Sequence, residues 1–160
     1  MGGNYGGFPV SSMDAIERAE SFARHEFPDT VEGCAPELID ALQRYRDDLG
    51  KVIHPSRHPS GWYRANGNPS SRHYHGDAGD IFPEGDPLRA FLLACRYFGG
   101  VGIYFDTIVN RLQPGPMLHV DLRSGLTIWA RDEGRYIYPA RGGDDYAEFW
   151  FLLARYAEDL

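Results

Sequence analysis

Apolar residues recur at helical spacing in four parts of the chain. The clearest repeat lies between Pro36 and Gly50 and consists of Leu38, Ile39, Leu42, Tyr45 and Leu49. Residues three and four positions apart share one face of an α-helix, and a first-turn proline and a terminal glycine are its usual boundary residues. The pattern therefore predicts a helix over 36–49 whose apolar stripe packs into the core.

Three further segments show the same periodicity. Ser11 or Ser12 can cap a first helix that ends at Pro28, and Asp86 can cap another that stops at a Gly-Gly pair. A last helix starts within residues 142–145 and is expected to pack on the sheet or, alternatively, to present its aromatic face to a partner. The faces expected to be buried are, in chain order, Met13, Ile16, Ala19, Phe22 and Ala23; Leu88, Phe91, Leu92, Cys95 and Phe98; and Tyr146, Phe149, Trp150, Leu153 and Ala157.

Shorter segments between these helices have the composition and alternation of β-strands. They predict strands at 51–53, 101–105 and 117–123, and a hairpin formed by 127–130 and 136–138. Helices at both ends with strands between them indicate an α+β fold, with a small, mostly antiparallel sheet and flanking helices.

The length of 160 residues corresponds most simply to one domain, expected over residues 11–160. Residues 1–10 are rich in glycine and are expected to form a flexible leader. The two cysteines, Cys34 and Cys95, do not make up a disulfide framework and are interpreted as buried free thiols.

The formal net charge of −7 argues against nucleic acid as the main partner, because neutralising phosphates requires a basic surface. No apolar run approaches the length of a transmembrane helix, so no membrane span is expected. The first residues lack the basic-then-apolar pattern of a signal peptide. The chain is therefore expected to be made in the cytoplasm.

The residues with the most distinctive chemistry lie in the stretch 71–80 and in a second segment further along the chain. Two imidazoles and a carboxylate, His73, Asp80 and His119, can occupy three corners of a tetrahedron around a metal ion, as in catalytic zinc sites. His75 is the nearest competitor for a ligand role and is interpreted as a rim residue. The small residues that let the backbone bring the first two ligands together are Gly76, Ala78 and Gly79.

The alternation of apolar and polar residues in the predicted strand 117–123 indicates which face of the strand carries the third ligand. The apolar side chains in this strand occupy alternate positions and point to one face. His119 and Asp121 must then share the other face, as expected for a metal ligand with a neighbouring acid. Taken singly, either His73 or His119 is more simply an ordinary polar residue, so the metal hypothesis depends on the two segments together.

The pattern Ser-x-His-x-x-Gly-x-Ala-x-Asp, followed by a downstream His-x-Asp, resembles the M15 family of zinc peptidases. This family includes D-alanyl-D-alanine carboxypeptidases and dipeptidases, and phage L-alanyl-D-glutamate endopeptidases that cut peptidoglycan stem peptides. The resemblance covers about Phe22 to Trp129. It implies the M15 fold, which hedgehog signalling domains share, a bound Zn²⁺, and a peptidoglycan stem peptide as substrate.

The resemblance also implies roles for individual residues. His73, Asp80 and His119 match the zinc ligands, and Ser71 is expected to support the site through a hydrogen bond. The segment 60–64 resembles the Ser-Gly-Tyr-Arg element that precedes the zinc motif in the family, with one additional tryptophan in this chain. Its arginine, Arg64, is expected to stabilise charge on the substrate or the transition state.

A zinc peptidase also needs a general base, and here the chain departs from part of the family. Many members have an acid three residues before the last ligand, where this chain has Pro116. Asp121 is the best remaining candidate for the base. It could instead orient His119 or bind Arg123, and Asp77 is a further candidate that the resemblance does not support.

Two functions are therefore expected. The first is a zinc peptidase that hydrolyses an amide bond in peptidoglycan stem peptides and acts on the cell wall after release or export, as a phage or prophage protein would. The second is a catalytically inactive M15-like zinc-binding module that acts in binding or as a phage structural component. Retention of the three ligand residues and Arg64 favours the first, whereas the proline at position 116 favours the second.

Overall fold

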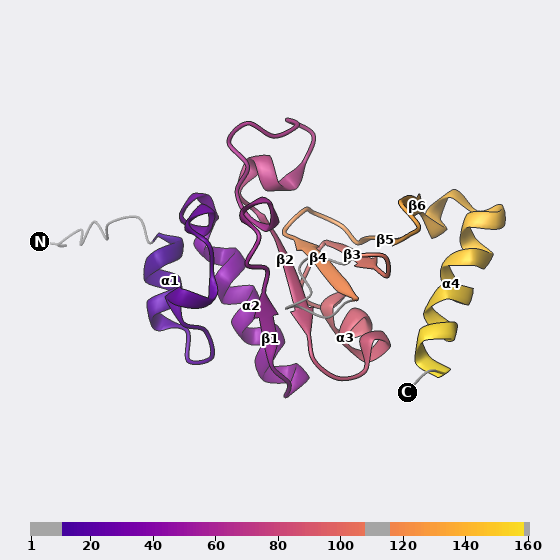
Figure 1. Ribbon diagram of the computed structural model, residues 1–160, viewed down its shortest axis with the longest axis horizontal. Helices are drawn as coiled ribbons and strands as arrows, with labels where there is room; N and C mark the ends of the chain where they lie inside the picture. The colour runs from indigo at the N-terminus through magenta and orange to yellow at the C-terminus, as the bar shows by residue number, and fades with distance from the viewer. Residues whose placement is uncertain (1–10, 108–115, 159–160) are drawn as a thin grey trace, which may run out of the picture.

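The computed structural model describes residues 11–107 and 116–158, and within these ranges the chain forms a six-stranded open sheet and four α-helices (Figure 1). The expected leader, residues 1–10, lies outside the described part. The strand order is β1-β2-β4-β3-β5-β6, and every pairing is antiparallel except that of β3 with β5. The strands are β1 (Ile53–Pro55), β2 (Ala78–Pro83), β3 (Gly100–Tyr104), β4 (Met117–Asp121), β5 (Thr127–Asp132) and β6 (Arg135–Ile137). The predicted α+β class and the mostly antiparallel sheet are confirmed.

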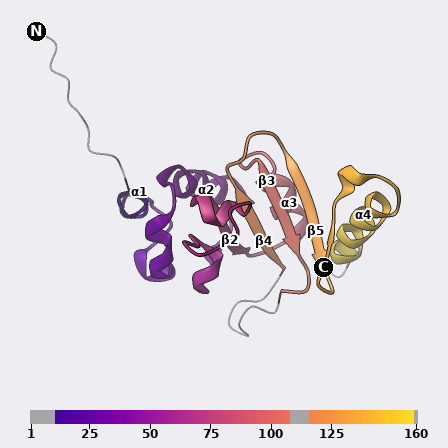
Figure 2. The same ribbon diagram turned by 90° about the horizontal axis from the view of Figure 1, so that it is seen from above.

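The helices are distributed around this sheet (Figures 1 and 2). They are α1 (Ser12–Arg18), α2 (Pro36–Leu49), α3 (Pro87–Ala94) and α4 (Gly143–Glu158). Helices α1 and α2 pack together on the side of β1 and β2, α4 lies beyond β5 and β6, and α3 contacts α2, α4 and β3. None of the helices in the described ranges combines the length and the apolar character that crossing a bilayer requires.

The pairing register separates the two faces of the sheet. Residues directly opposite one another on paired strands point to the same face. One row across five strands is entirely buried and apolar, and consists of Ile81, Leu118, Ile103, Ala130 and Ile137. The neighbouring row points to the opposite face and consists of Asp80, His119, Gly102 and Trp129. The period of two along each strand thus places the core on one face and the polar candidates on the other.

Helix α2 has the predicted boundaries, since it begins at Pro36 and is followed by Gly50 in the left-handed conformation. Its predicted apolar stripe is buried. The hydroxyl of Tyr45 donates a hydrogen bond to the carbonyl of Ala90 at 2.8 Å, which joins α2 to α3.

The first predicted helix is too long. Ser11 caps α1 through a capping box with Asp14, but the helix ends at Arg18 and the chain continues as two 3-10 turns, Arg24–Glu26 and Asp29–Gly33. Beyond the helix, the N–H of Ser21 donates to the Gln43 side chain on α2 instead of to its own helix. A tertiary contact therefore replaces the next helical turn.

The predictions for the remaining helices are correct in place and partly wrong in detail. Helix α3 ends at Ala94, four residues early, and Leu92 is 49% exposed because the buried face is that of Ala90, Phe91 and Ala94. On α4 the buried residues are Phe149, Leu152 and Leu153, whereas Tyr146 and Trp150 are exposed. Each helix therefore buries a narrower or rotated face than its full apolar pattern suggests.

The predicted strands are confirmed with shifted ends. The hairpin of β5 and β6 forms as expected, and the strand predicted at 51–53 lies at 53–55 instead. Strand β1 is at the edge of the sheet, where Pro55 is tolerated because it need not donate a ladder hydrogen bond. Both cysteines are free thiols, and burial raises the pKa of Cys34 to about 12 and that of Cys95 to about 11.

Replacing Leu42 with alanine should lower the free energy of unfolding by about 2–5 kcal/mol, since the deletion leaves a cavity in the core. The Leu42 side chain is fully buried on α2. Chemical denaturation followed by circular dichroism would measure the change. Leu92→Ala on α3 is the matched control and should cost no more than about 0.5 kcal/mol. Equal losses in the two variants would contradict the assignment of the α2 stripe to the core.

Candidate metal centre

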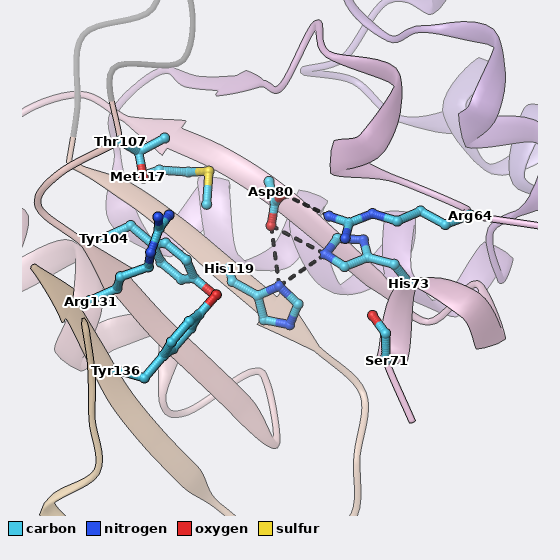
Figure 3. A pocket seen from close by; sticks show the side chains of 10 residues that line it. All are labelled: Arg64, Ser71, His73, Asp80, Tyr104, Thr107, Met117, His119, Arg131 and Tyr136. Atoms are coloured by element: carbon cyan, nitrogen blue, oxygen red, sulfur yellow. Dashed lines mark hydrogen bonds and ion pairs between the residues drawn. The ribbon is translucent and has the colours of Figure 1, made fainter. Parts of the chain in front are cut away.

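Three separate elements bring His73, Asp80 and His119 to one point (Figure 3). His73 lies on the 3-10 turn Arg72–His75, and Asp80 on β2 is directly opposite His119 on β4. The Nε2 atom of His73 is 3.1 Å from Nδ1 of His119 and 3.4 Å from Oδ1 of Asp80, and that oxygen is 3.2 Å from Nδ1 of His119. All three residues are buried. This cluster, predicted from the sequence, is a group that could bind a metal ion.

Hydrogen bonds behind the cluster fix which ring nitrogens face its centre. A carbonyl only accepts, so the 2.9 Å contact between Nδ1 of His73 and the Trp62 carbonyl makes Nδ1 the donor. Nε2 of His119 likewise donates to Oδ2 of Asp121 at 3.1 Å. The opposite nitrogen of each neutral ring then carries a lone pair. Two nitrogen lone pairs and one carboxylate oxygen therefore converge, as in metal sites whose histidines are held by outer hydrogen bonds.

The separations between these atoms suit a small tetrahedral ion. Ligand atoms about 2.0–2.2 Å from a tetrahedral metal lie about 3.3–3.6 Å from one another. The separations of 3.1, 3.2 and 3.4 Å are within a few tenths of an ångström of that range. The three donors therefore need little movement to coordinate a cation.

The electrostatics of the cluster also favour a positive charge at its centre. Burial alone would raise the pKa of Asp80. When no metal is bound and the rings of His119 and His73 are protonated, their hydrogen bonds to this carboxylate outweigh burial, so the pKa of Asp80 lies well below its usual range. Burial alone would lower the pKa of His119, but hydrogen bonds to Asp121 and Asp80 outweigh it, so that pKa is raised. A cation held between the three groups would satisfy the same attraction.

Asp121 lies behind the ring of His119 and does not reach the open side of the cluster. Its carboxylate is fully buried and accepts from Nε2 of His119. It also accepts from Nε, Nη2 and the backbone N–H of Arg123, at 2.7, 2.6 and 3.1 Å. This carboxylate does not line the cavity on the far side of the ligands. These contacts favour the alternative that the sequence had left open, in which Asp121 orients His119, and its role as general base stays a prediction.

Two glycines on β3 make room for this support and were not recognised as part of the site from sequence. A Cβ atom at Gly100 would lie 2.3 Å from Oδ2 of Asp121, and one at Gly102 would lie 2.3 Å from the Trp129 ring. Side chains at these positions would displace the groups that pack against His119, whose ring centroid is 5.2 Å from that of Trp129.

Trp62 is also part of the site, although the sequence identified it only as an additional residue in the motif. Its ring is fully buried and its Nε1 donates to the carbonyl of Ser56 at 2.8 Å. A Cβ atom at Gly79 would lie 2.7 Å from the ring, so that glycine serves packing within β2 and not the turn that had been expected. The Trp62 carbonyl, fixed by this packing, accepts the hydrogen bond from His73.

The open side of the cluster faces a cavity of about 300 Å³ (Figure 3). Arg64 lies on one wall, with Nη2 3.8 Å from Oδ2 of Asp80 and Nε donating to the Ser60 carbonyl. Ser71 also lines the cavity, but among the described residues no hydrogen bond joins its hydroxyl to the three ligands, contrary to prediction. The lining residues not anticipated from sequence are Tyr104, Thr107, Met117, Arg131 and Tyr136.

The remaining candidates lie outside the cluster. Asp77 is paired with Arg72 and does not line the cavity. His75 is exposed and does not line the cavity, and its Nε2 contacts the carbonyl of Pro69 at 2.9 Å.

Comparison with family models, with curated proteins and with solved structures found no match to this chain. The functional assignment must therefore be argued from the residues of the site.

Replacing Asp121 with asparagine should weaken divalent-metal binding about 10–100-fold, because His119 loses the charged acceptor that orients its ring. Competition with a chromophoric chelator would measure the affinity. Asp40→Asn, at an exposed position on α2, is the matched control and should bind as wild type. An unchanged affinity in Asp121→Asn would show that this carboxylate does not support the ligand.

Proposed function

We propose that the protein is a zinc-dependent peptidase of the M15 type that hydrolyses an amide bond in peptidoglycan stem peptides. The observation that carries the proposal is the convergence of three fixed lone pairs, from His73, His119 and Asp80, on the floor of an open cavity. Three protein ligands with a fourth position open to solvent are typical of catalytic zinc sites, whereas structural zinc sites have four protein ligands.

The donor set suits zinc, which accepts imidazole nitrogen and carboxylate oxygen together. When bound in such a site, zinc lowers the pKa of its water ligand to about 7 and polarises a carbonyl group. The chain supplies the ligands, holds the tautomers of both histidines, and buries the cluster so that charge–charge attraction is weakly screened.

Arg64 is the residue proposed to stabilise the charge that develops on the substrate carbonyl. Its backbone N–H donates to the His73 carbonyl at 3.1 Å, which ties the arginine to the ligand turn. Its Nε is engaged with the Ser60 carbonyl, and Nη2 lies on the cavity side near Asp80. A planar, permanently charged donor beside the metal position suits an oxyanion.

The α+β architecture is compatible with the M15 fold that the motif suggests. We include the M15 fold itself in the proposal. The substrate is a cell-wall component, so the protein would act after release or export from the cytoplasm, as a phage or prophage enzyme does.

One observation favours the second candidate, a zinc-binding module without catalysis of the kind represented by hedgehog domains. Within the described ranges, Asp80 is the only carboxylate that lines the cavity, and Asp121 is directed away from it. A peptidase of this type needs a group that accepts a proton from bound water. The two candidates differ in turnover and not in metal binding.

His73→Ala should abolish both stoichiometric zinc binding and cleavage of purified muropeptides, because the cluster loses one of three ligands. Metal analysis and chromatography of the digests would measure the two properties. His75→Ala is the matched control, since this exposed histidine lies outside the cluster and should leave both unchanged. In wild type, a chelator should stop cleavage and added zinc should restore it.

Cleavage that persists in metal-free His73→Ala would overturn the peptidase proposal. Zinc bound by wild type without turnover of any muropeptide would instead establish the non-catalytic module.

Arg64→Ala should lower kcat for muropeptide hydrolysis by about 10²–10³, the loss typical of removing one donor to an oxyanion. Zinc content should stay at the wild-type value, because Arg64 is not a ligand. Steady-state kinetics and metal analysis on the same preparation would test this. An unchanged kcat would remove Arg64 from the reaction.

A further inference from the structure

The wall of the cavity opposite Arg64 carries a second arginine. Arg131 on β5 is paired in register with Tyr104 on β3 and with Tyr136 on β6, and all three side chains line the cavity. The Arg131 guanidinium lies 5.7 Å from each of the two ring centroids. Figure 3 shows this guanidinium and that of Arg64 on opposite sides of the cluster formed by the three proposed ligands. The two tyrosines hold the Arg131 side chain in place without using its hydrogen-bond donors.

Few donors of Arg131 are engaged by the chain itself. Its Nε lies 3.6 Å from Oδ2 of Asp106, an ion-pair contact, and that oxygen accepts the N–H of Gly134. Nε is buried and faces this carboxylate, so it is not directed at a ligand. The hydroxyl of Thr107, which lines the same cavity, is also buried and makes no hydrogen bond with any described residue. Buried polar groups without partners are few in native proteins, and a ligand is one explanation for them.

The formal charge of the cavity lining is positive, whereas that of the whole chain is negative. The formal net charge is −7, yet the lining contains two guanidinium groups, Arg64 and Arg131, and a single carboxylate, Asp80, which faces the metal position. Asp106 offsets part of the charge of Arg131 from the side of Nε, which leaves the terminal nitrogens for another group. A planar guanidinium fork matches a carboxylate in charge and shape.

The sheet geometry limits how far the Arg131 guanidinium lies from the metal position. Arg131 is two strands across and two residues along from His119. At about 4.8 Å per strand and 3.3 Å per residue, their Cα atoms are about 12 Å apart. The guanidinium and the metal position both lie at the ends of side chains on this face of the sheet, so the span between them is of the same order, a few residues of extended peptide at most.

We propose that Arg131 forms an anion subsite that binds a carboxylate of the substrate, within a few residues of the bond placed at the metal, with the Thr107 hydroxyl as a further donor. This subsite rests on the proposed function for its description of the substrate, but it is a binding site and can be tested without turnover. In a stem peptide, the carboxylate is either the C-terminal one or that of the γ-linked glutamate, and the two sources share this chemistry.

The test uses zinc-loaded full-length protein and three forms of one synthetic stem pentapeptide: the free acid, the C-terminal amide, and the form amidated at the glutamate carboxylate. Stopped-flow tryptophan fluorescence records binding before turnover, with Trp129 beside the cavity as a reporter. Wild type should bind the free acid about tenfold or more tightly than one of the two amides. The amide that binds weakly identifies the carboxylate.

In Arg131→Met this preference should fall to about one, and Arg131→Lys should keep part of it, because charge remains without the fork. Arg44→Gln, which removes a charge from an exposed position on α2, should behave as wild type. Zinc content and circular dichroism would show that the variants are folded and loaded.

An acid preference that survives in Arg131→Met, equal binding of all three forms, or no binding of any form would overturn the subsite. The failure of the peptidase proposal is distinct: discrimination by Arg131 with no cleavage of any form would leave the subsite standing and remove the hydrolytic activity.

Discussion

The site depends on the register of one strand pair. Asp80 and His119 are directly opposite each other on β2 and β4, and a slip of one residue would turn one of them towards the core while the other kept its place. The neighbouring pair, Ile81 and Leu118, is fully apolar and packs on the other face. The core thus determines the register, and the register brings the two ligands within contact of each other.

Burying the ligand cluster beside this core is tolerated because each of its polar groups has a partner. The three ligands and the carboxylate behind them are less than a tenth exposed: His73, Asp80, His119 and Asp121. An isolated buried charge is costly, whereas a paired one with further hydrogen bonds is not. Arg123 supplies the positive charge behind Asp121, and a cation would supply it for Asp80. Metal binding and folding stability should therefore rise and fall together.

The sequence predicted the features that local pattern determines. Helix α2 follows from its periodicity and end residues, and the shared face of His119 and Asp121 follows from strand alternation. The ligand cluster was predicted from spacing and motif. Features that depend on distant pairing could not be predicted: the end of α1, where Gln43 takes a backbone donor, and the contact of Arg131 with two neighbouring strands.

The two glycines of β3 contribute to the site by having no side chains. Gly100 and Gly102 pair with Asp121 and His119 in antiparallel register, and each is free of a side chain where a functional group must pass over the strand. A Gly-x-Gly strand paired with a His-x-Asp strand therefore supplies two things together: the ligand and its support on one strand, and the space for them on the other. A larger residue at either position would displace Asp121 or Trp129 and so obstruct the site from the side of the strand, which makes the two glycines as necessary to the site as its ligands.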